Sequence, residues 1–396
     1  MTRYFFIIVL ASTLLACGDS DNTEPPAELV DFEPSLEVNE LWSVDTGAGV
    51  EQLYVKLFPL ILEKTIVVTD REGRVSAYNS EDGSELWQTE LNIVVSGGVG
   101  GDEDHLVVTS RNGNVYLLDS KGELLWNVDA SSEVLMPAEI SAEQIIIRSV
   151  DGRISALALQ DGSEKWSYKR DVPALTLRGN SSPLIKQGYI FNGLDNGRLV
   201  ALDLLDGHSV FDIPVATPAG RSELERLVDI DGHSTIVDDT LYMASYQGKV
   251  VSIDIRRGQL NWSRKLSTYS GVEHSYSGLF LSDDKDHIWA LEASNGATLW
   301  KQEKLQSRGI TRPVVMGKAL VVADFEGYIH WLSAFDGHFL ARIDTDDSGV
   351  IVPPVVHNER LYIITRDGEL SAFEVKAVDD ESESDKSESD EPESDE

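Results

Sequence analysis

The stretch EGRVSAYNSEDGSELW, residues 72–87, recurs along most of the chain with the same internal spacing. Six further copies end at Trp126, Trp166, Phe211, Trp262, Trp300 and Ala341. Each copy begins with a turn residue, usually glycine, which is followed two and five positions later by apolar residues. A second turn then precedes a short segment that ends in Leu-Trp or a related pair. Because glycine permits the positive φ of tight turns, each copy predicts a β-hairpin.

The spacing of the copies predicts the architecture. Their tryptophan-type positions lie 38 to 51 residues apart, and another apolar run precedes most hairpins. A period near forty residues with four short strands is typical of a β-propeller blade. The last hairpin, through Phe373, lacks a tryptophan strand, and the first tryptophan strand, at Trp42, lacks a hairpin. Joining the two completes an eighth blade without exposed sheet edges. We therefore predict an all-β, eight-bladed propeller of four-stranded antiparallel blades over residues 38–378, closed by the N- and C-terminal strands, with tryptophans packed between blades.

Composition and charge exclude several classes of function. The 396 residues are 41% hydrophobic and 26% charged, which is ordinary for a folded protein. With 33 Lys and Arg against 68 Asp and Glu, the net charge is −35, so nucleic acid is not an expected partner. The single cysteine, Cys17, rules out a disulfide framework, a CxxC pair and a cysteine zinc site. No nucleophile elbow, HExxH segment or P-loop occurs, so we expect no enzyme activity, metal or cofactor.

Both ends of the chain differ from the middle. Residues 1–16 have a basic start and a short apolar run, which predicts a signal peptide. Its end, Leu-Leu-Ala before Cys17, resembles the bacterial lipobox, which implies a lipidated cysteine; an ordinary signal peptide with a chance cysteine is the alternative. Gly18 follows, and the lack of an aspartate there implies the outer membrane. Residues 17–37 predict an acidic tether. Residues 379–396 are almost entirely acidic and serine residues, which predicts a disordered tail.

The repeat unit, G-x-V-x-A-L-D followed by D-G-x-x-L-W, resembles the tryptophan-docking repeat of quinoprotein (PQQ) dehydrogenases. Eight such units behind a lipobox resemble the BamB family, the lipoproteins of the outer-membrane β-barrel assembly (Bam) machinery. The resemblance covers residues 1–378. It implies a non-catalytic scaffold on the periplasmic face of the outer membrane, held there by its lipid. Its implied partners are the periplasmic part of BamA and other Bam components, and direct contact with unfolded barrel precursors is left open.

Two segments match the family more specifically. Pro173–Gly179 contains Leu-x-Leu-Arg-Gly, and Arg226–Asp231 contains Asp-x-Asp. By resemblance, these motifs imply that BamA is contacted by Leu175, Leu177, Arg178, Asp229 and Asp231. The sequence supports this choice independently, since two consecutive intervals between tryptophan-type positions are longer than most others. The extra residues extend two neighbouring connections on one face of a propeller, and loops on a rigid scaffold commonly carry binding residues.

Structural alternatives to a binding role exist for all five residues. Leu175 and Leu177 could lie in a buried inner strand, and Asp229 and Asp231 could cap turns. Arg178 could pair with the aspartates and hold the two loops together, or be braced by Asp229 while its edge meets the partner. Two other functions also remain as alternatives. One is an enzyme resembling PQQ-dependent dehydrogenases, for which no calcium-ligand set can be placed, and the other is a generic cell-envelope scaffold.

Overall fold

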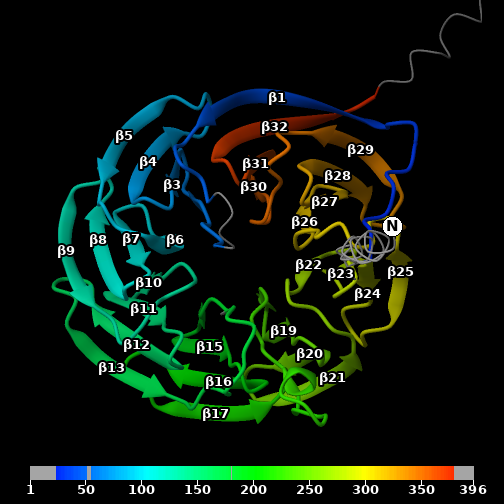
Figure 1. The fold of residues 1–396 in the computed structure, drawn as a ribbon. Coiled ribbons are helices and arrows are strands. Elements are labelled where there is room, and N and C mark those ends of the chain that lie inside the picture. The colour runs from blue at the N-terminus through cyan, green and yellow to red at the C-terminus, as the bar shows by residue number, and fades with distance from the viewer. Residues whose placement is uncertain (1–23, 51–54, 180, 379–396) are drawn as a thin grey trace, which may run out of the picture.

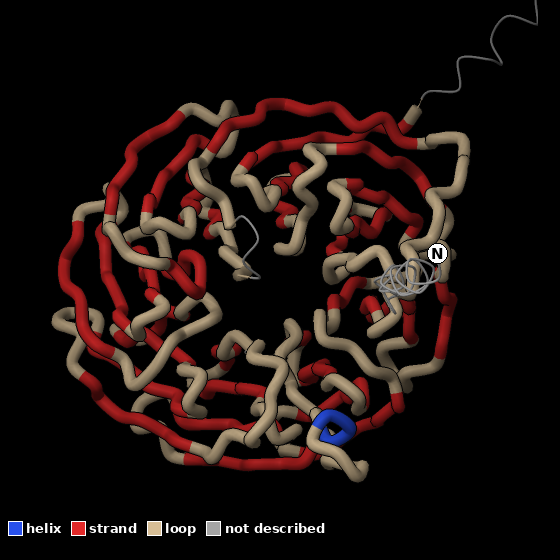
Figure 2. The backbone as a smooth tube through the Cα atoms, viewed as in Figure 1, coloured by secondary structure: helices blue, strands red, loops and turns tan. Residues whose placement is uncertain are grey.

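The computed structural model of this chain describes residues 24–50, 55–179 and 181–378. In these residues eight four-stranded antiparallel sheets stand around a common axis, and each sheet is one blade of a ring (Figure 1). Figure 2 shows strands throughout the ring and one helical turn, η1 (Leu224–Arg226), in the described chain. The predicted all-β, eight-bladed propeller is confirmed.

Seven blades are each built from four consecutive strands, running from the axis to the rim (Figure 1). Blades 1 and 2 contain β2 (Leu60–Ile61), β3 (Thr65–Thr69), β4 (Arg74–Asn79) and β5 (Glu85–Glu90), then β6 (Val95–Gly101), β7 (His105–Ser110), β8 (Asn114–Asp119) and β9 (Leu124–Asp129). Blades 3 and 4 contain β10 (Glu139–Ser141), β11 (Gln144–Arg148), β12 (Arg153–Ala158) and β13 (Glu164–Lys169), then β14 (Leu184–Lys186), β15 (Tyr189–Gly193), β16 (Arg198–Asp203) and β17 (Ser209–Pro214). Blades 5 and 6 contain β18 (Thr235–Val237), β19 (Thr240–Ala244), β20 (Lys249–Asp254) and β21 (Gln259–Lys265), then β22 (Glu273–Ser275), β23 (Gly278–Ser282), β24 (Ile288–Leu291) and β25 (Thr298–Gln302). Blade 7 contains β26 (Val314–Met316), β27 (Ala319–Ala323), β28 (Tyr328–Ser333) and β29 (Phe339–Asp344).

Blade 8 closes the ring with strands from both ends of the chain. Three strands come from the C-terminal part: β30 (Val355–His357), β31 (Arg360–Ile364) and β32 (Glu369–Ala377). The rim strand is β1 (Leu36–Asp45), which pairs antiparallel with β32 so that Trp42 faces Ala372. This is the closure expected from the hairpin that lacks a tryptophan strand. It joins segments more than 300 residues apart and leaves no unpaired blade in the ring.

The repeated tryptophans join each blade to the next. Trp87 donates its indole N–H to the carbonyl of Ser120 in blade 2 at 3.0 Å, and Trp126 does the same to Leu159 in blade 3 at 2.9 Å. The turn glycine of the following blade lies under the ring, because a Cβ added to Gly122 would come within 2.5 Å of Trp87. The same indole bond recurs at Trp166, Trp262 and Trp300. The predicted packing of tryptophans between blades is confirmed.

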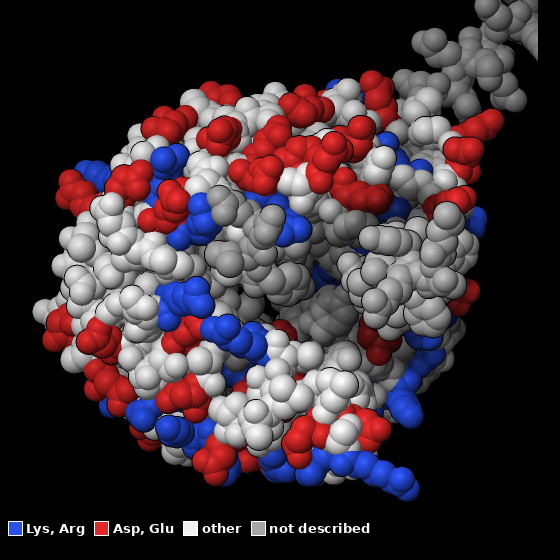
Figure 3. Space-filling model, in the orientation of Figure 1, with Lys and Arg blue, Asp and Glu red and all other residues white. Residues whose placement is uncertain are grey.

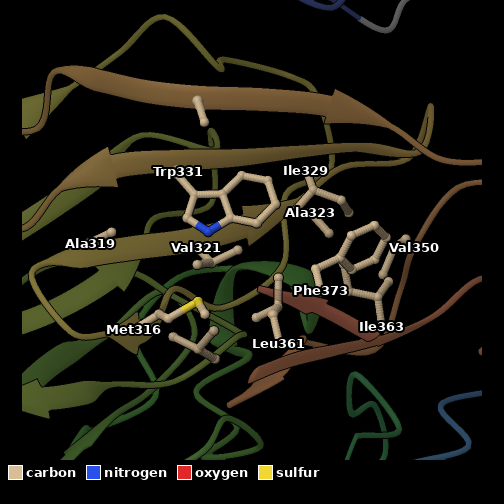
Figure 4. Close-up of a cluster of buried hydrophobic side chains, with 12 residues drawn as sticks. Met316, Ala319, Val321, Ala323, Ile329, Trp331, Val350, Leu361, Ile363 and Phe373 are labelled. Atoms are coloured by element: carbon tan, nitrogen blue, oxygen red, sulfur yellow. The ribbon is translucent and has the colours of Figure 1, made fainter. Parts of the chain in front are cut away.

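The hydrophobic core is divided among the interfaces between blades. Middle strands such as β27 are buried along their whole length, because both faces of a blade are covered by its neighbours. Figure 4 shows one such cluster, in which the fully buried Trp331 of blade 7 lies with Val321, and Leu361 and Phe373 come from blade 8. Burial of this kind supplies most of the stabilisation of the ring.

The described part of the predicted tether lies against blade 7. The amide of Ser35 donates to the carbonyl of Leu340 at 2.9 Å, and Arg342 donates to the carbonyl of Val30 at 3.1 Å. The Phe32 ring stacks on Phe339 with 5.4 Å between centroids. Residues 24–35 therefore lack regular secondary structure but are docked, and the first strand begins two residues before the predicted boundary.

Three predicted features lie outside the described residues. These are the signal peptide at 1–16, the lipidated Cys17 and the acidic tail at 379–396. Within the described ranges, no helix is both long and apolar enough to cross a membrane.

Candidate partner-binding face

The connections between blades gather on one face of the ring. Each leaves the rim strand of one blade and enters the axial strand of the next, so all of them lie at the same end of the blades (Figure 2). Three consecutive connections carry the residues of interest: 130–138, 170–183 (described except for residue 180) and 215–234. A central cavity of about 980 Å³ is lined by residues from all three, and it is the hollow visible in Figure 3.

Leu175 and Leu177 lie in the connection between blades 3 and 4. Their exposed fractions are 42% and 38%, which is high for leucine, and neither belongs to a strand. The inner strand of blade 4 begins only at Leu184. The alternative in which these leucines form a buried inner strand is therefore wrong.

Arg178 is held in an unusual backbone conformation. Its φ is +55°, in the left-handed region that residues with side chains rarely adopt. Its amide donates to the Thr176 hydroxyl at 3.1 Å, and its guanidinium forms an ion pair with Glu133 from the preceding connection. The Arg178 side chain is 61% exposed, whereas Glu133 is only 11% exposed. The alternatives in which Arg178 pairs with the aspartates or is braced by Asp229 are wrong, because its guanidinium pairs with Glu133.

Asp229 holds the backbone of the loop instead. Its Oδ1 accepts the amide of Leu177 at 3.2 Å, while the residue itself is 1% exposed. Asp231 lies against Gly179, where an added Cβ would come within 2.8 Å of the Asp231 carboxylate. Glycine is therefore required at this position by the close approach of the two loops. The structure brings all five predicted residues together, but it places both aspartates beneath the loop that carries the leucines.

Burial dominates the electrostatics of the two aspartates. It raises the pKa of Asp229 to about 6 and that of Asp231 to about 7, and the nearby Asp195 carboxylate adds to both shifts. Arg148 opposes these shifts, but its guanidinium is bound to Asp195 at 2.7 Å. Neither Asp229 nor Asp231 forms an ion pair with a described residue, although the Lys56 ammonium interacts electrostatically with Asp231.

Sequence reasoning missed Glu133, Arg148 and Asp195. Each lies outside the two matching motifs, in another connection, a strand or a turn of the ring. Arg148 also donates to the carbonyl of Gly193 at 2.7 Å, which ties blade 3 to blade 4 below the loops. The only signal in the sequence is a charged residue at the end of a buried β11, and such residues usually lie at a solvated strand end.

The central cavity collects basic side chains on a strongly acidic protein. Figure 3 shows basic groups beside the hollow, whereas acidic groups gather over β1 and β32 at the rim. Burial lowers the pKa of Lys56 and of Arg312, whose guanidinium forms an ion pair with Glu273. The basic residues of the lining are Lys56, Arg111, Arg178, Arg312 and Arg366. Four acidic residues line the same cavity, so basic and acidic side chains alternate beside the exposed Leu177: Glu133, Glu139, Asp231 and Asp284.

Comparison with known proteins identifies the family. A sequence model described as outer membrane protein assembly factor BamB matches residues 71–302 and 295–380. The chain belongs to the BamB family. It is 36% identical to the BamB of Pseudomonas aeruginosa over 376 residues, which are 94% of this chain and 99% of that one. It is 32% identical to the BamB of Escherichia coli over 375 residues, which are 91% and 96% of the two chains.

Solved structures agree with the BamB assignment. The crystal structure of BamB from Moraxella catarrhalis is 30% identical, with a TM-score of 0.79, and the match covers 85% of this chain and all of that one. A quinohemoprotein alcohol dehydrogenase from Comamonas testosteroni has a TM-score of 0.68 at 12% identity, over 85% of this chain and 76% of that one. At that identity the likeness shows the propeller fold alone.

Proposed function

We propose that this chain is the lipoprotein scaffold of an outer-membrane protein assembly machinery and docks onto the periplasmic part of BamA. Lipid on Cys17 anchors it to the periplasmic side of the outer membrane, and the ring itself catalyses no reaction. One observation carries the docking site: Leu175 and Leu177 are exposed on a loop whose backbone is pinned by Asp229. Apolar side chains presented by a fixed loop bind with little loss of conformational entropy.

The five residues divide into two roles. Leu175 and Leu177 lose their exposed apolar surface to the partner, and the exposed edge of Arg178 adds charge-assisted hydrogen bonds. Asp229 and Asp231 act as positioning residues, because their carboxylates are buried and meet the loop from below. The docking face thereby brings BamA and incoming barrel precursors close to one rigid surface.

Co-purification tests this proposal. The full-length lipoprotein is tagged, envelopes are solubilised in mild detergent, and captured BamA is measured by quantitative blotting. We expect Arg178→Glu to lose at least ten-fold in captured BamA, because it replaces the exposed cation and repels Glu133. Arg256→Glu is the matched control, since Arg256 is 68% exposed and ion-paired with Asp239 on the opposite face.

Two outcomes would contradict the proposal. If the unmodified protein captures no BamA under conditions that preserve the complex, the docking role fails. If Arg256→Glu loses BamA as strongly as Arg178→Glu, the site is not on this face. A parallel assay with added PQQ and calcium tests the absence of catalysis, and we expect neither a new absorbance band nor dye reduction.

A further inference from the structure

Three carboxylates meet beneath the exposed leucines. Asp195 follows β15 in blade 4, whereas Asp229 and Asp231 come from the connection between blades 4 and 5. One carboxylate oxygen from each lies within 4.8 Å of the others. The segment that carries the two later aspartates is held from both sides, since Ile230 donates to the carbonyl of Leu194 at 3.4 Å and the carbonyl of Asp229 accepts from an amide of blade 5.

Three of the carboxylate oxygens in this cluster are buried without a well-formed hydrogen bond. Both oxygens of Asp231 and Oδ2 of Asp229 are inaccessible to solvent, and none of the three accepts a well-formed hydrogen bond from the described residues. The Gly179 amide lies close enough to Asp231 to lower the pKa of its carboxyl, whereas Oδ2 of Asp229 has no such donor. Asp229 is 1% exposed and Asp195 is 7% exposed. A buried polar group that accepts no hydrogen bond costs on the order of 1–3 kcal/mol, and a charged one costs more. Buried carboxylate oxygens that face one another without a well-formed hydrogen bond need a bound cation to compensate them when they are ionised.

The protein supplies too little positive charge to the cluster. Arg148 is the only described residue that forms an ion pair with any of the three carboxylates, and its Nη2 contacts Asp195 at 2.7 Å. Its Nη1 is occupied by the Gly193 carbonyl at 2.7 Å. Arg178, the nearest cation of the loop, pairs with Glu133 instead. The Lys56 ammonium also interacts electrostatically with Asp231, so one guanidinium and one ammonium face three carboxylates, and negative charge is left in excess when all are ionised.

We propose that Asp195, Asp229 and Asp231 bind a divalent cation, and that Ca²⁺ is the ion the site fits best. Hard divalent cations prefer carboxylate oxygens. Calcium holds its oxygens at about 2.3–2.6 Å, so two ligands of one ion lie at most about 5 Å apart, as these three do. Magnesium requires a tighter octahedron at about 2.1 Å and keeps most of its water.

A cation here ties together the elements that carry the docking loop. Asp229 binds the ion through the oxygen it does not use for the Leu177 amide, and Asp231 sits against Gly179. Asp195 is the third ligand and connects blade 4 to the same ion. The ion thereby holds the leucine loop on its support. This consequence for BamA rests on the proposed function, whereas binding of the ion does not.

Calcium titration of the full-length protein tests the site. The detergent-solubilised lipoprotein is stripped with chelator and titrated with CaCl₂ by calorimetry in 0.15 M NaCl, which suppresses weak binding to surface acids. Terbium luminescence provides a second readout, because the Tyr246 amide donates to the Asp229 carbonyl at 2.9 Å and a tyrosine this near can sensitise a bound lanthanide. We expect one saturable site with a dissociation constant of about 0.1–1 mM, as in extracellular calcium modules.

Substitutions locate the ion. Asp231→Asn and Asp229→Asn are each expected to weaken calcium at least ten-fold. Asp206→Asn is the matched control, because Asp206 belongs to the exposed group of Asp203, Asp206 and His208 and is expected to leave the saturable site unchanged. Circular dichroism shows whether each variant is folded, and terbium luminescence shows whether it binds the ion. If one of the two aspartate variants fails to fold, the conclusion rests on the other.

Two results would overturn the inference. One is the absence of saturable binding to the unmodified protein up to 10-fold above the expected dissociation constant. The other is unchanged affinity in both folded Asp229→Asn and Asp231→Asn. Either result with normal BamA capture would leave the docking proposal standing. Saturable calcium binding without BamA capture would support the ion site and contradict the docking proposal.

Discussion

Blade 4 makes two different kinds of contact at its two ends. At one end its last turn meets blade 3. Trp166 is 8% exposed, its ring covers Gly207, and its indole donates to the carbonyl of Leu204 at 3.1 Å. The buried polar group has its partner, and the same contact recurs around the ring. This end is organised for stability.

The other end of blade 4 is organised differently. There Asp195 meets Asp229 and Asp231, and several buried oxygens have no partner. Among the described residues, the other acidic group close enough to share an ion is largely exposed. The leucine loop lies directly above. Repeated contacts thus stabilise the ring, whereas the unrepeated polar cluster costs stability at the place where we propose that a partner binds.

The largest expected effect comes from breaking the stable end. Trp166→Ala removes a buried ring and its hydrogen bond, so it is expected to lower the unfolding free energy by about 3–5 kcal/mol. Trp166→Phe keeps most of the ring and is expected to cost less than half as much. Denaturant unfolding followed by fluorescence of the other tryptophans measures both. Equal losses in the two variants would show that ring packing is not the source of the stability.

Breaking the leucine loop is expected to affect binding and spare stability. Leu177→Ser removes an anchor that is already 38% exposed, so we expect less than 1 kcal/mol of destabilisation and a loss of about ten-fold or more in BamA capture. Leu205→Ser is the matched control, since Leu205 is 71% exposed in a turn on the opposite face. A loss of BamA with Leu205→Ser would place the partner elsewhere.

The carboxylate cluster is expected to make stability depend on pH when chelator is present. The pKa of Asp231 is about 7 in the folded protein, well above the value of about 3.9 in an unfolded chain. Because the pKa of this carboxyl is higher in the folded state, the protonated carboxyl contributes its full stabilisation at pH values below the unfolded-state pKa. This contribution to the free energy of unfolding is lost as the pH rises through 7. Asp231→Asn removes the ionisation, so its unfolding free energy relative to the unmodified protein should rise from pH 4.5 to pH 7.5 by on the order of 2 kcal/mol.

Paired unfolding curves at the two pH values measure this difference. Asp206→Asn serves as the control, because the carboxyl of Asp206 is exposed and its pKa is lowered by contacts with His208. A difference for Asp231→Asn that stays constant from pH 4.5 to 7.5 would show that the Asp231 carboxyl titrates normally.

The smallest effect is expected at the ion pair between Arg178 and Glu133. Glu133→Gln removes the charge but keeps the shape, and exposed or half-exposed ion pairs contribute about 0–1 kcal/mol. We expect stability to change by less than 1 kcal/mol and BamA capture to stay within about three-fold. A ten-fold loss of captured BamA would show that Glu133 holds Arg178 in the position that BamA recognises.

Most of the fold could be predicted because its signals are local. The turn glycines and the apolar positions that follow them lie within single hairpins, as in residues 72–87. The unfinished hairpin at Phe373 and the orphan strand at Trp42 also indicated closure, which β1 and β32 confirm. The docked path of residues 24–35 could not be predicted, because its acidic, proline-containing sequence is typical of a tether and its contacts with blade 7 are distant in the chain.

The candidate site was predictable only in part. The motifs pointed to Leu175, Leu177, Arg178, Asp229 and Asp231, and these residues do lie together. Their relations were not predictable. Which acid pairs with Arg178 depends on the path of a connection 45 residues away, and a buried aspartate has the same sequence signature as a turn cap.

The sequence by itself determined the eight-bladed ring, its closure and the family, because each blade repeats one short pattern whose physics is contained in a hairpin. Only the tertiary structure decided which side chains meet at the axis. The stacking of blades 3, 4 and 5 brings Glu133, Asp195 and Asp231 from separate segments to the support of the leucine loop. Burial and mutual repulsion, which no local pattern encodes, raise the pKa of Asp229 and Asp231 at the place where we propose that a cation binds.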